Sequence, residues 1–453
     1  MTQADFHATP LANADAVPRP AVKPRRLRLR RIAYVLLLAA TLAGVAALGG
    51  SVAPAQDPLD QRLDRLTAGL RFDLVQWEVD ALIGKVGDLL NSPDAGLSPS
   101  EADALVRSYI TAAQRAGQLE GDIERIFSDP QIADPEAATA GQRAELATIR
   151  RQLDQQASAA EAILQGQLSQ IIRQEGLDTA GAVWPPPQMR FTEPPQMLVV
   201  SPRDRIQRLR SIDLLADLDT SGRERLESAV SHEDNLSAYV TGIGGYGVFP
   251  TMVVDRYGLP WTAETIAHEW VHTYLAFRPL GWSFLEGGDA VTMNETVASI
   301  IGEELGQKLL QAYYPDLAPP PPQPANQADA PPAAEDEFDF GREMHATRVA
   351  VDDLLAAGYV DEAEAFMEAR RQTFLDNGYR LRVLNQAYFA FHGSYATGPA
   401  ATDPIGPKLE RLRELSPSLS DFMRVASGLT SVTELDKTLT QLEELARPEG
   451  ALP

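Results

Sequence analysis

The chain has 453 residues, no cysteine and a formal net charge of -23, and 44% of its residues are hydrophobic. This composition excludes a disordered protein, and the lack of cysteine excludes disulfides, thiolate metal ligands and cysteine nucleophiles. Residues 1–31 carry seven Lys or Arg against two Asp, so this leader is +5 and the rest of the chain sums to -28. A body this acidic repels phosphate backbones, which argues against nucleic acid as a partner.

An uncharged segment of 19 residues, 32–50, follows the basic leader directly. At the rise of an α-helix this length matches the roughly 30 Å hydrocarbon core of a bilayer, so it predicts a transmembrane anchor. Because the Lys and Arg residues precede it, the positive-inside rule predicts a single-pass protein of the cell membrane, with residues 1–31 cytoplasmic and the body extracytoplasmic. The sequence Ala53-Pro54-Ala55 resembles a signal-peptide cleavage site, which leaves removal of the segment open.

Residues 57–183 carry the pattern of helices. Apolar side chains recur there every three or four positions, starting with Leu59 and Leu63, which is the spacing of one buried helix face. Ser98 and Glu101 have the spacing of a capping box, which predicts a helix start. We therefore expect a helical stalk or bundle between the membrane and the rest of the body.

Prolines divide the remainder of the body into a unit at 198–314, a loop at 315–340 and a C-terminal part at 341–448. Prolines at 185–187 interrupt the helical pattern before the first unit, and the loop is rich in Pro and acidic residues, which favours exposure. The C-terminal part predicts a helical subdomain. Its helices are expected at 342–374, 380–391, 407–415 and 432–446. The expected fold class is mainly α, within α+β, with a small sheet in the first unit.

His268, Glu269 and His272 belong to an HExxH motif. The i,i+4 spacing puts both imidazoles on one face of a helix, where two neutral nitrogens can chelate one zinc ion. Glu269 lies next to them and can polarise a water molecule on the metal without occupying a coordination position. Because the chain has only six histidines, a chance HExxH is a poor explanation of this pattern.

A catalytic zinc ion takes three protein ligands and keeps one position open, so a third ligand is expected elsewhere. The metzincin class is excluded, since no Gly and third His follow His272 at the required spacing. The candidates are Glu295, on a second predicted helix beginning near residue 289 or 292, and the carboxylates of Glu286, Asp289 and Glu303. Glu295 also has the spacing of a capping box with Thr292, which is the alternative interpretation of that glutamate.

An HExxH helix followed by a helix with the sequence Asn294-Glu295 resembles the gluzincins, the thermolysin-like zinc peptidases. The resemblance covers mainly residues 242–310 and implies a zincin-like catalytic domain at 198–314, with one Zn²⁺ per chain and Glu295 as its third ligand. It also implies that a peptide or protein is the substrate. In that family an Asp four residues after the ligand Glu braces the first zinc His. Ser299 stands there in this chain, so the surroundings of the metal are expected to differ.

Residues 241–255 alternate in polarity after a glycine cluster, which predicts a strand leading into the HExxH helix. The resemblance implies that this strand is an edge strand that pairs with the substrate backbone, while an ordinary sheet strand is the alternative. Further along, the resemblance implies that His392 or Tyr395 donates a hydrogen bond to the oxyanion of the reaction. The alternative is that His392 caps a helix C-terminus and Tyr395 packs.

The function expected from these residues is hydrolysis of a peptide bond, with Glu269 as the catalytic base. Two alternatives stay open at this point. One is a membrane scaffold that zinc stabilises without catalysis. The other is a zinc hydrolase that cleaves an amide that is not part of a protein. It stays open because the residues that line a substrate pocket and select the substrate form no recognisable motif.

Overall fold

The computed structural model describes residues 57–446, except 128–130, 180, 233–234, 285–286, 321–337, 396–397 and 403. The basic leader, the apolar segment at 32–50, the Ala55 cleavage site and most of the Pro-rich loop lie outside the described residues. The anchor therefore stays a prediction. Among the helices of the described part, none combines the length and apolarity needed to cross a membrane.

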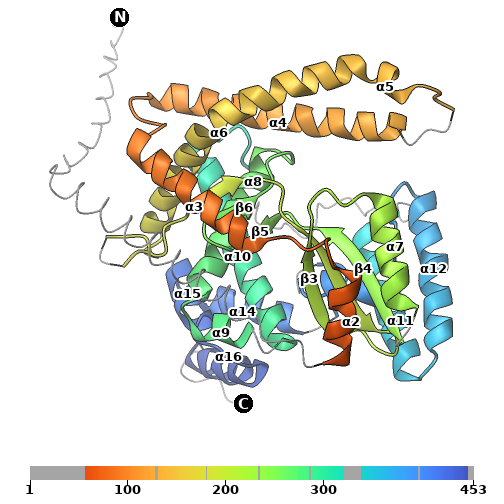
Figure 1. Ribbon diagram of the computed structural model, residues 1–453. Coiled ribbons are helices and arrows are strands. Elements are labelled where there is room, and N and C mark those ends of the chain that lie inside the picture. The colour runs from red at the N-terminus through yellow and green to blue at the C-terminus, as the bar shows by residue number, and fades with distance from the viewer. Residues whose placement is uncertain are drawn as a thin grey trace, which may run out of the picture.

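The described chain is mainly helical with two small sheets, which confirms the expected α+β class (Figure 1). The N-terminal helices are α2 (Pro58–Leu66), α3 (Leu74–Asn91), α4 (Pro99–Phe127), α5 (Pro135–Ala138) and α6 (Ala140–Gln174). The central helices are α7 (Thr220–Ser231), α8 (Leu259–Leu275), α9 (Pro279–Ser283) and α10 (Asp289–Tyr313). The C-terminal helices are α11 (Phe340–Ala356), α12 (Val360–Asp376), α13 (Gln386–His392), α14 (Ile405–Leu415), α15 (Leu419–Ala426) and α16 (Val432–Ala446).

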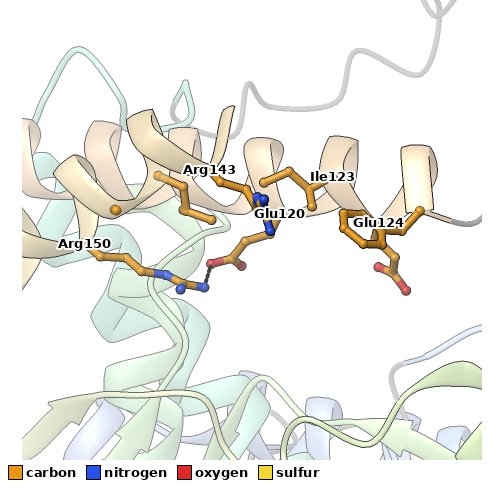
Figure 2. Close-up of a pocket in the computed structure, with 8 residues that line it drawn as sticks. Glu120, Ile123, Glu124, Arg143 and Arg150 are labelled. Atoms are coloured by element: carbon orange, nitrogen blue, oxygen red, sulfur yellow. Dashed lines mark hydrogen bonds and ion pairs between the residues drawn. The ribbon is translucent and has the colours of Figure 1, made fainter. Parts of the chain in front are cut away.

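Helices α4 and α6 form a long antiparallel arm that extends from the body (Figure 1). The predicted capping box starts α4: the Ser98 backbone N–H donates to Glu101 Oε2 at 2.8 Å, and the Glu101 N–H donates to Ser98 Oγ at 3.3 Å. Near the far end of the arm, Arg150 pairs with Glu120 across the two helices at 2.9 Å (Figure 2). Both partners are exposed there, so this pair contributes little to stability.

Residues 57–183 do not pack as a stalk set apart from the rest of the body. The inner halves of α4 and α6 share one hydrophobic core with α8 and α10, in which Leu164 and Ile172 lie with Trp270 and Val297. Helix α2 instead packs through Leu63 against α7 and against the sheet that contains Leu198 and Val240. A shared core of this kind makes the N-terminal helices part of the frame that supports the central helices.

The two sheets have three strands each. The first has the order β1 (Met189–Phe191), β6 (Thr251–Val253) and β5 (Gly245–Tyr246), with β1 parallel and β5 antiparallel to β6. The second has the order β3 (Arg210–Leu214), β2 (Gln196–Pro202) and β4 (Leu236–Gly242), and is antiparallel throughout. The single strand predicted at 241–255 is therefore wrong: the segment contains the end of β4 and a short β5–β6 hairpin. Its glycines give a strand little to pack, and Pro250 has no N–H for a ladder.

The backbones of α8 and α10 lie unusually close to each other at two glycines. A Cβ atom on Gly302 would lie 2.9 Å from the Cα of His268, and one on Gly306 would lie 2.7 Å from the Cα of Glu264. Real side chains do not tolerate such distances to backbone atoms, so both positions require glycine. The contact fixes the start of α10 beside the HExxH segment of α8.

The C-terminal helices form two groups rather than one subdomain. Helices α11 and α12 replace the single helix predicted at 342–374, because Gly358 adopts a positive φ of 82° and turns the chain between them. They pack with α13 near the second sheet, whereas α14 and α15 pack on α10 and α16 packs on α14. The helix predicted at 432–446 is confirmed as α16, and α15 was not expected.

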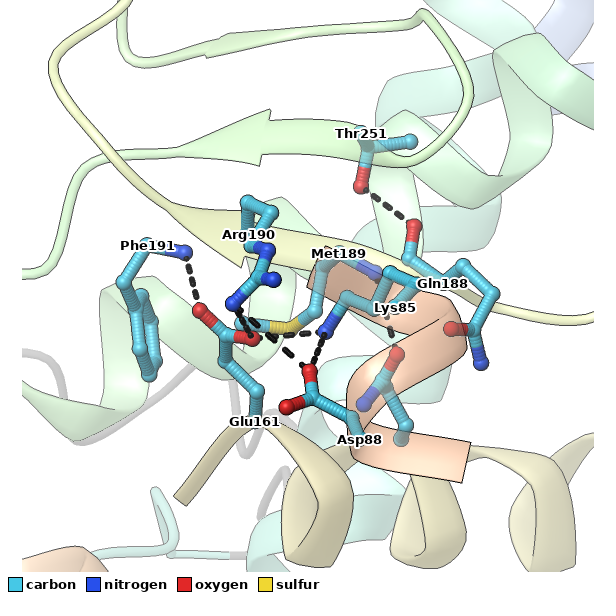
Figure 3. A network of polar contacts seen from close by, with 9 residues as sticks. Lys85, Asp88, Glu161, Gln188, Met189, Arg190, Phe191 and Thr251 are labelled. Atoms are coloured by element: carbon cyan, nitrogen blue, oxygen red, sulfur yellow. Dashed lines mark hydrogen bonds and ion pairs between the residues drawn. The ribbon is translucent and has the colours of Figure 1, made fainter. Parts of the chain in front are cut away.

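A buried ion pair fastens α3, α6 and β1 together (Figure 3). Lys85 Nζ lies 2.6 Å from Glu161 Oε2, and both side chains are at most 2% exposed. The other oxygen, Glu161 Oε1, accepts the backbone N–H of Phe191 at 2.9 Å, and Arg190 Nη1 approaches Oε2 at 3.4 Å. Burial lowers the pKa of Lys85, and the Glu161 carboxylate opposes this shift. The charge on Lys85 therefore depends on its partner.

Replacement of Glu161 by Gln is expected to lower the free energy of unfolding by about 3 kcal/mol, because it leaves the Lys85 ammonium buried without its counter-charge. The matched control is Glu120→Gln, which removes the same charge from the exposed pair in Figure 2 and is expected to cost less than about 0.5 kcal/mol. Urea unfolding of the two variants measures the difference. An equal loss of unfolding free energy in the two variants would show that the buried pair contributes no more to stability than the exposed pair.

Candidate functional site

Helices α8 and α10 place three side chains around one point. The Nε2 atoms of His268 and His272 lie 3.0 Å apart, and Glu295 Oε2 lies 3.6 Å from the first and 3.5 Å from the second. The two histidines are one turn apart on α8, and Glu295 is near the start of α10. The fold thus brings together the three residues that the sequence predicts as metal ligands.

The spacing of these donor atoms fits a tetrahedral zinc ion. Bonds of about 2.0 to 2.2 Å at tetrahedral angles separate neighbouring ligand atoms by roughly 3.3 to 3.5 Å, and the observed distances of 3.0 to 3.6 Å bracket that range. Within the described part of the chain, no second group of His, Asp and Glu side chains is close enough to share an ion. Two imidazoles and one carboxylate are also the donor set of zinc sites that keep an open position.

The charges of this triad favour a cation. Burial lowers the pKa of His272, but the nearby Glu295 carboxylate outweighs burial and raises that pKa to about 9. Burial would in turn raise the pKa of Glu295, but the two imidazoles hold it far below its usual range. The field that retains a proton between these groups also attracts a metal ion, which must displace that proton to bind.

Asn294 orients one of the two histidines. His272 Nδ1 lies 2.8 Å from Asn294 Oδ1, and the amide is almost fully buried. An amide oxygen accepts, so Nδ1–H donates and the lone pair of Nε2 faces the other ligands. Ser299, which stands where gluzincins carry an Asp, donates its Oγ to the Glu295 carbonyl at 2.9 Å. In this chain the residue that orients a histidine of the triad is therefore Asn294, which precedes Glu295, and it contacts His272, the second histidine of the motif.

Glu269 lies beside the triad but outside it. Its side chain is 5% exposed, and Oε2 has no hydrogen-bond partner among the described residues. Burial raises the pKa of Glu269, while both imidazoles oppose this shift. Two glycines press on this helix face: a Cβ on Gly245 would lie 2.2 Å from Glu269 Oε1, and one on Gly247 would lie 2.6 Å from the Cβ of His272. The glycine cluster thus permits strand β5 to approach Glu269 closely.

The triad opens into a cavity of about 570 Å³ between the two sheets and α8. Strand β5 forms one wall. It pairs with β6 through one edge only, and no strand of the described chain pairs with its other edge. The lining residues include Met197, Gly242, Ile243, Gly244, Gly245, Tyr246, Gly247, Trp261, Glu264, Thr265, Phe284, Phe391 and Tyr395. An unpaired edge at a cavity has backbone groups available for an extended ligand.

The structure separates the two candidates for oxyanion stabilisation. Tyr395 lines the cavity, and the Glu295 and Glu269 charges together with burial keep its pKa well above the usual range, so its hydroxyl retains its proton. His392 does not line the cavity. Its ring packs 4.2 Å from that of Tyr388 at the end of α13, its Nε2 is buried without a partner in the described chain, and burial lowers its pKa to about 4. Of the two candidates, Tyr395 alone lines the cavity, because aromatic packing holds the His392 ring outside the lining.

The other carboxylate candidates do not join the triad. Asp289 begins α10 and Glu303 lies two turns beyond Glu295, and neither belongs to the group that could hold an ion. Glu286 lies outside the described residues. The capping-box alternative for Glu295 is excluded, since α10 has already begun at Asp289 and Thr292 is inside the helix.

Arg208, which precedes β3, belongs to no sequence motif and was not expected at the site. Its guanidinium lies 5.5 Å above the ring of Phe391, Nη2 donates to Ser394 Oγ at 2.9 Å, and Nε is buried without a partner in the described chain. Burial lowers its pKa, and the Glu295 and Tyr395 charges oppose that shift. A positive charge thus stands behind the Phe391–Tyr395 wall. No local motif marks it, because β2 and α13 bring it there only in the folded chain.

Comparisons of this chain with protein-family models, with curated proteins and with solved structures found no match.

Replacement of Asn294 by Ala is expected to weaken zinc binding by about 10-fold to 100-fold, because the His272 ring loses the acceptor that orients it. Ser299→Ala is the matched control, since its hydroxyl bonds only to a helix carbonyl, and it is expected to bind zinc as the wild type does. Competition with a chelator at fixed pH measures both constants. Unchanged affinity in the Asn294 variant would show that the brace is dispensable.

Proposed function

We propose that this chain is a zinc metallopeptidase that hydrolyses peptide bonds. The observation that carries the proposal is the arrangement at α8 and α10: two imidazoles and a carboxylate spaced for one tetrahedral ion, with the buried, unpartnered Oε2 of Glu269 beside them. His268, His272 and Glu295 would hold Zn²⁺, which when bound would supply a Lewis acid able to lower the pKa of water to about 7.

Glu269 is the general base in this proposal. Its free Oε2 accepts a proton from the attacking water, and the same carboxyl returns that proton to the amine nitrogen as the peptide bond breaks. Burial raises the pKa of the Glu269 carboxyl. It therefore favours the step in which this carboxyl carries the proton. Glycines at 245 and 247 allow the substrate backbone to approach the base without a side chain between them.

Strand β5 and Tyr395 complete the proposed machinery. An extended peptide pairs with the free edge of β5, which holds its scissile carbonyl over the triad. The protonated hydroxyl of Tyr395 donates to the oxygen of that carbonyl as negative charge develops on it, and the Arg208 charge behind it adds to the stabilisation.

The cavity argues against the scaffold alternative. Structural zinc sites are closed by four protein ligands, whereas this triad offers three and opens into the space beside Glu269. Hydrolysis of a non-protein amide would use the same residues. Whether the protein cleaves peptides therefore decides between a peptide and a non-protein amide as its substrate. We also propose that the segment at 32–50 anchors the enzyme in the cell membrane with its body outside the cytoplasm.

Replacement of Glu269 by Gln is expected to lower turnover of a peptide library at least 1000-fold, because the amide cannot accept the proton. Zinc content should stay at one ion per chain, since Glu269 is not a ligand. Elemental analysis and library digestion of the full-length chain test both. Loss of zinc with turnover would assign Glu269 a structural role, and no cleavage by the zinc-loaded wild type would contradict the proposed function.

Replacement of Tyr395 by Phe is expected to lower kcat about 100-fold with little change in KM, because the lost hydrogen bond forms only in the transition state. Tyr388→Phe is the matched control: it removes a hydroxyl from the same segment, outside the cavity lining, and should leave kcat unchanged. Steady-state kinetics on one library peptide measure both variants. Equal kcat in the Tyr395 variant and the wild type would remove Tyr395 from the mechanism.

A further inference from the structure

One end of the cavity carries a carboxylate and an indole on the same helix face as the metal ligands. Trp261, Glu264, Thr265 and His268 follow one another along the cavity side of α8. At 1.5 Å per residue, the backbone of Glu264 lies about 6 Å along the axis from that of His268. This end of the cavity has no role in the catalytic steps proposed above.

The carboxylate of Glu264 has no partner among the residues that the structure describes. No hydrogen bond or ion pair joins it to any residue of the described chain, and the charges that act on it are those of Glu303 and His268. Glu264 is exposed at the rim of the cavity, and partial burial of its carboxyl followed by the Glu303 charge raises its pKa. A carboxylate that lines a cavity beside a like charge, without a Lys or Arg of its own, attracts a cation from outside.

Trp261 supplies an aromatic surface at the same place. Gly244 abuts its ring, since a Cβ there would lie 2.5 Å from Cζ2, and the ring of Tyr257 meets it edge-on with centroids 4.8 Å apart. These contacts fix the indole while part of it still lines the cavity. An indole beside a carboxylate is a favourable environment for an ammonium or guanidinium group, which gains both a cation–π contact and an ion pair.

We propose that Trp261 and Glu264 form a subsite for a Lys or Arg side chain of the substrate, adjacent to the bond that is cleaved. This inference rests on the proposed peptidase function and adds its substrate class: peptides with a basic residue. The distance along α8 suits a long side chain, because the four-carbon stem of Lys and the comparable stem of Arg carry the charge away from the backbone. The net charge of -23 draws such peptides toward the enzyme.

The test compares two fluorogenic peptides that differ only in one residue next to the scissile bond, Arg in one and its neutral isostere citrulline in the other. Both carry an acetylated N-terminus, so a free amine cannot replace the side chain. The zinc-loaded full-length wild type is expected to cleave the Arg peptide with a kcat/KM at least 10-fold higher. Glu264→Gln should reduce this ratio to within 2-fold of unity, and Trp261→Leu should reduce it in part.

Glu303→Gln is the matched control, because Glu303 is an exposed carboxylate near Glu264 that does not line the cavity and accepts a hydrogen bond from Gln307 at 3.0 Å. It should keep the preference for Arg. Equal cleavage of both peptides by the wild type, or an Arg preference that survives Glu264→Gln, overturns the subsite and leaves the peptidase intact. Absence of cleavage of any peptide overturns the peptidase itself.

Discussion

The close contact between α8 and α10 is the constraint on which the rest of the site depends. Only glycine fits at 302 and 306, because a Cβ atom at either position would lie less than 3 Å from the backbone of α8. That approach brings the carboxylate of Glu295 within 3.6 Å of both imidazoles and the amide of Asn294 against His272. The N-terminal helices and α14 to α16 pack around this pair and hold it in place.

Buried charges have two different roles in this molecule. At Glu161 every charge has a counter-charge, and the network links α3 to α6 and β1, which also pack against each other. At the cavity the charges are left without such partners: Glu269 has a free oxygen, and Arg208 has a free nitrogen behind Tyr395, among the residues that the structure describes. Unsatisfied polar atoms lower stability. Those of Glu269 and Arg208 lie at or behind the cavity wall, and elsewhere in the described chain Asp88, Gln196 and Gln386 each have one as well.

Much of the secondary structure follows from local patterns. Helices at 98–127 and 432–446 were predictable from a capping box and from apolar spacing, because these signals act within a few residues. The strand at 241–255 was not predicted correctly, since pairing partners decide where a glycine-rich segment bends. Arg208 and Glu264 were missed as well: neither belongs to a motif, and their roles arise from what the fold places next to them.

The sequence by itself determined that two imidazoles share one helix face, because the HExxH spacing places them one turn apart whatever surrounds them. It also determined the charge asymmetry between the basic leader and the acidic body. Only the tertiary structure decided that Glu295 and not Asp289 or Glu303 completes the triad, and that Tyr395 and not His392 lines the cavity. The physical reason is that residues far apart in the chain meet through helix packing and strand pairing, whose distances no local pattern contains.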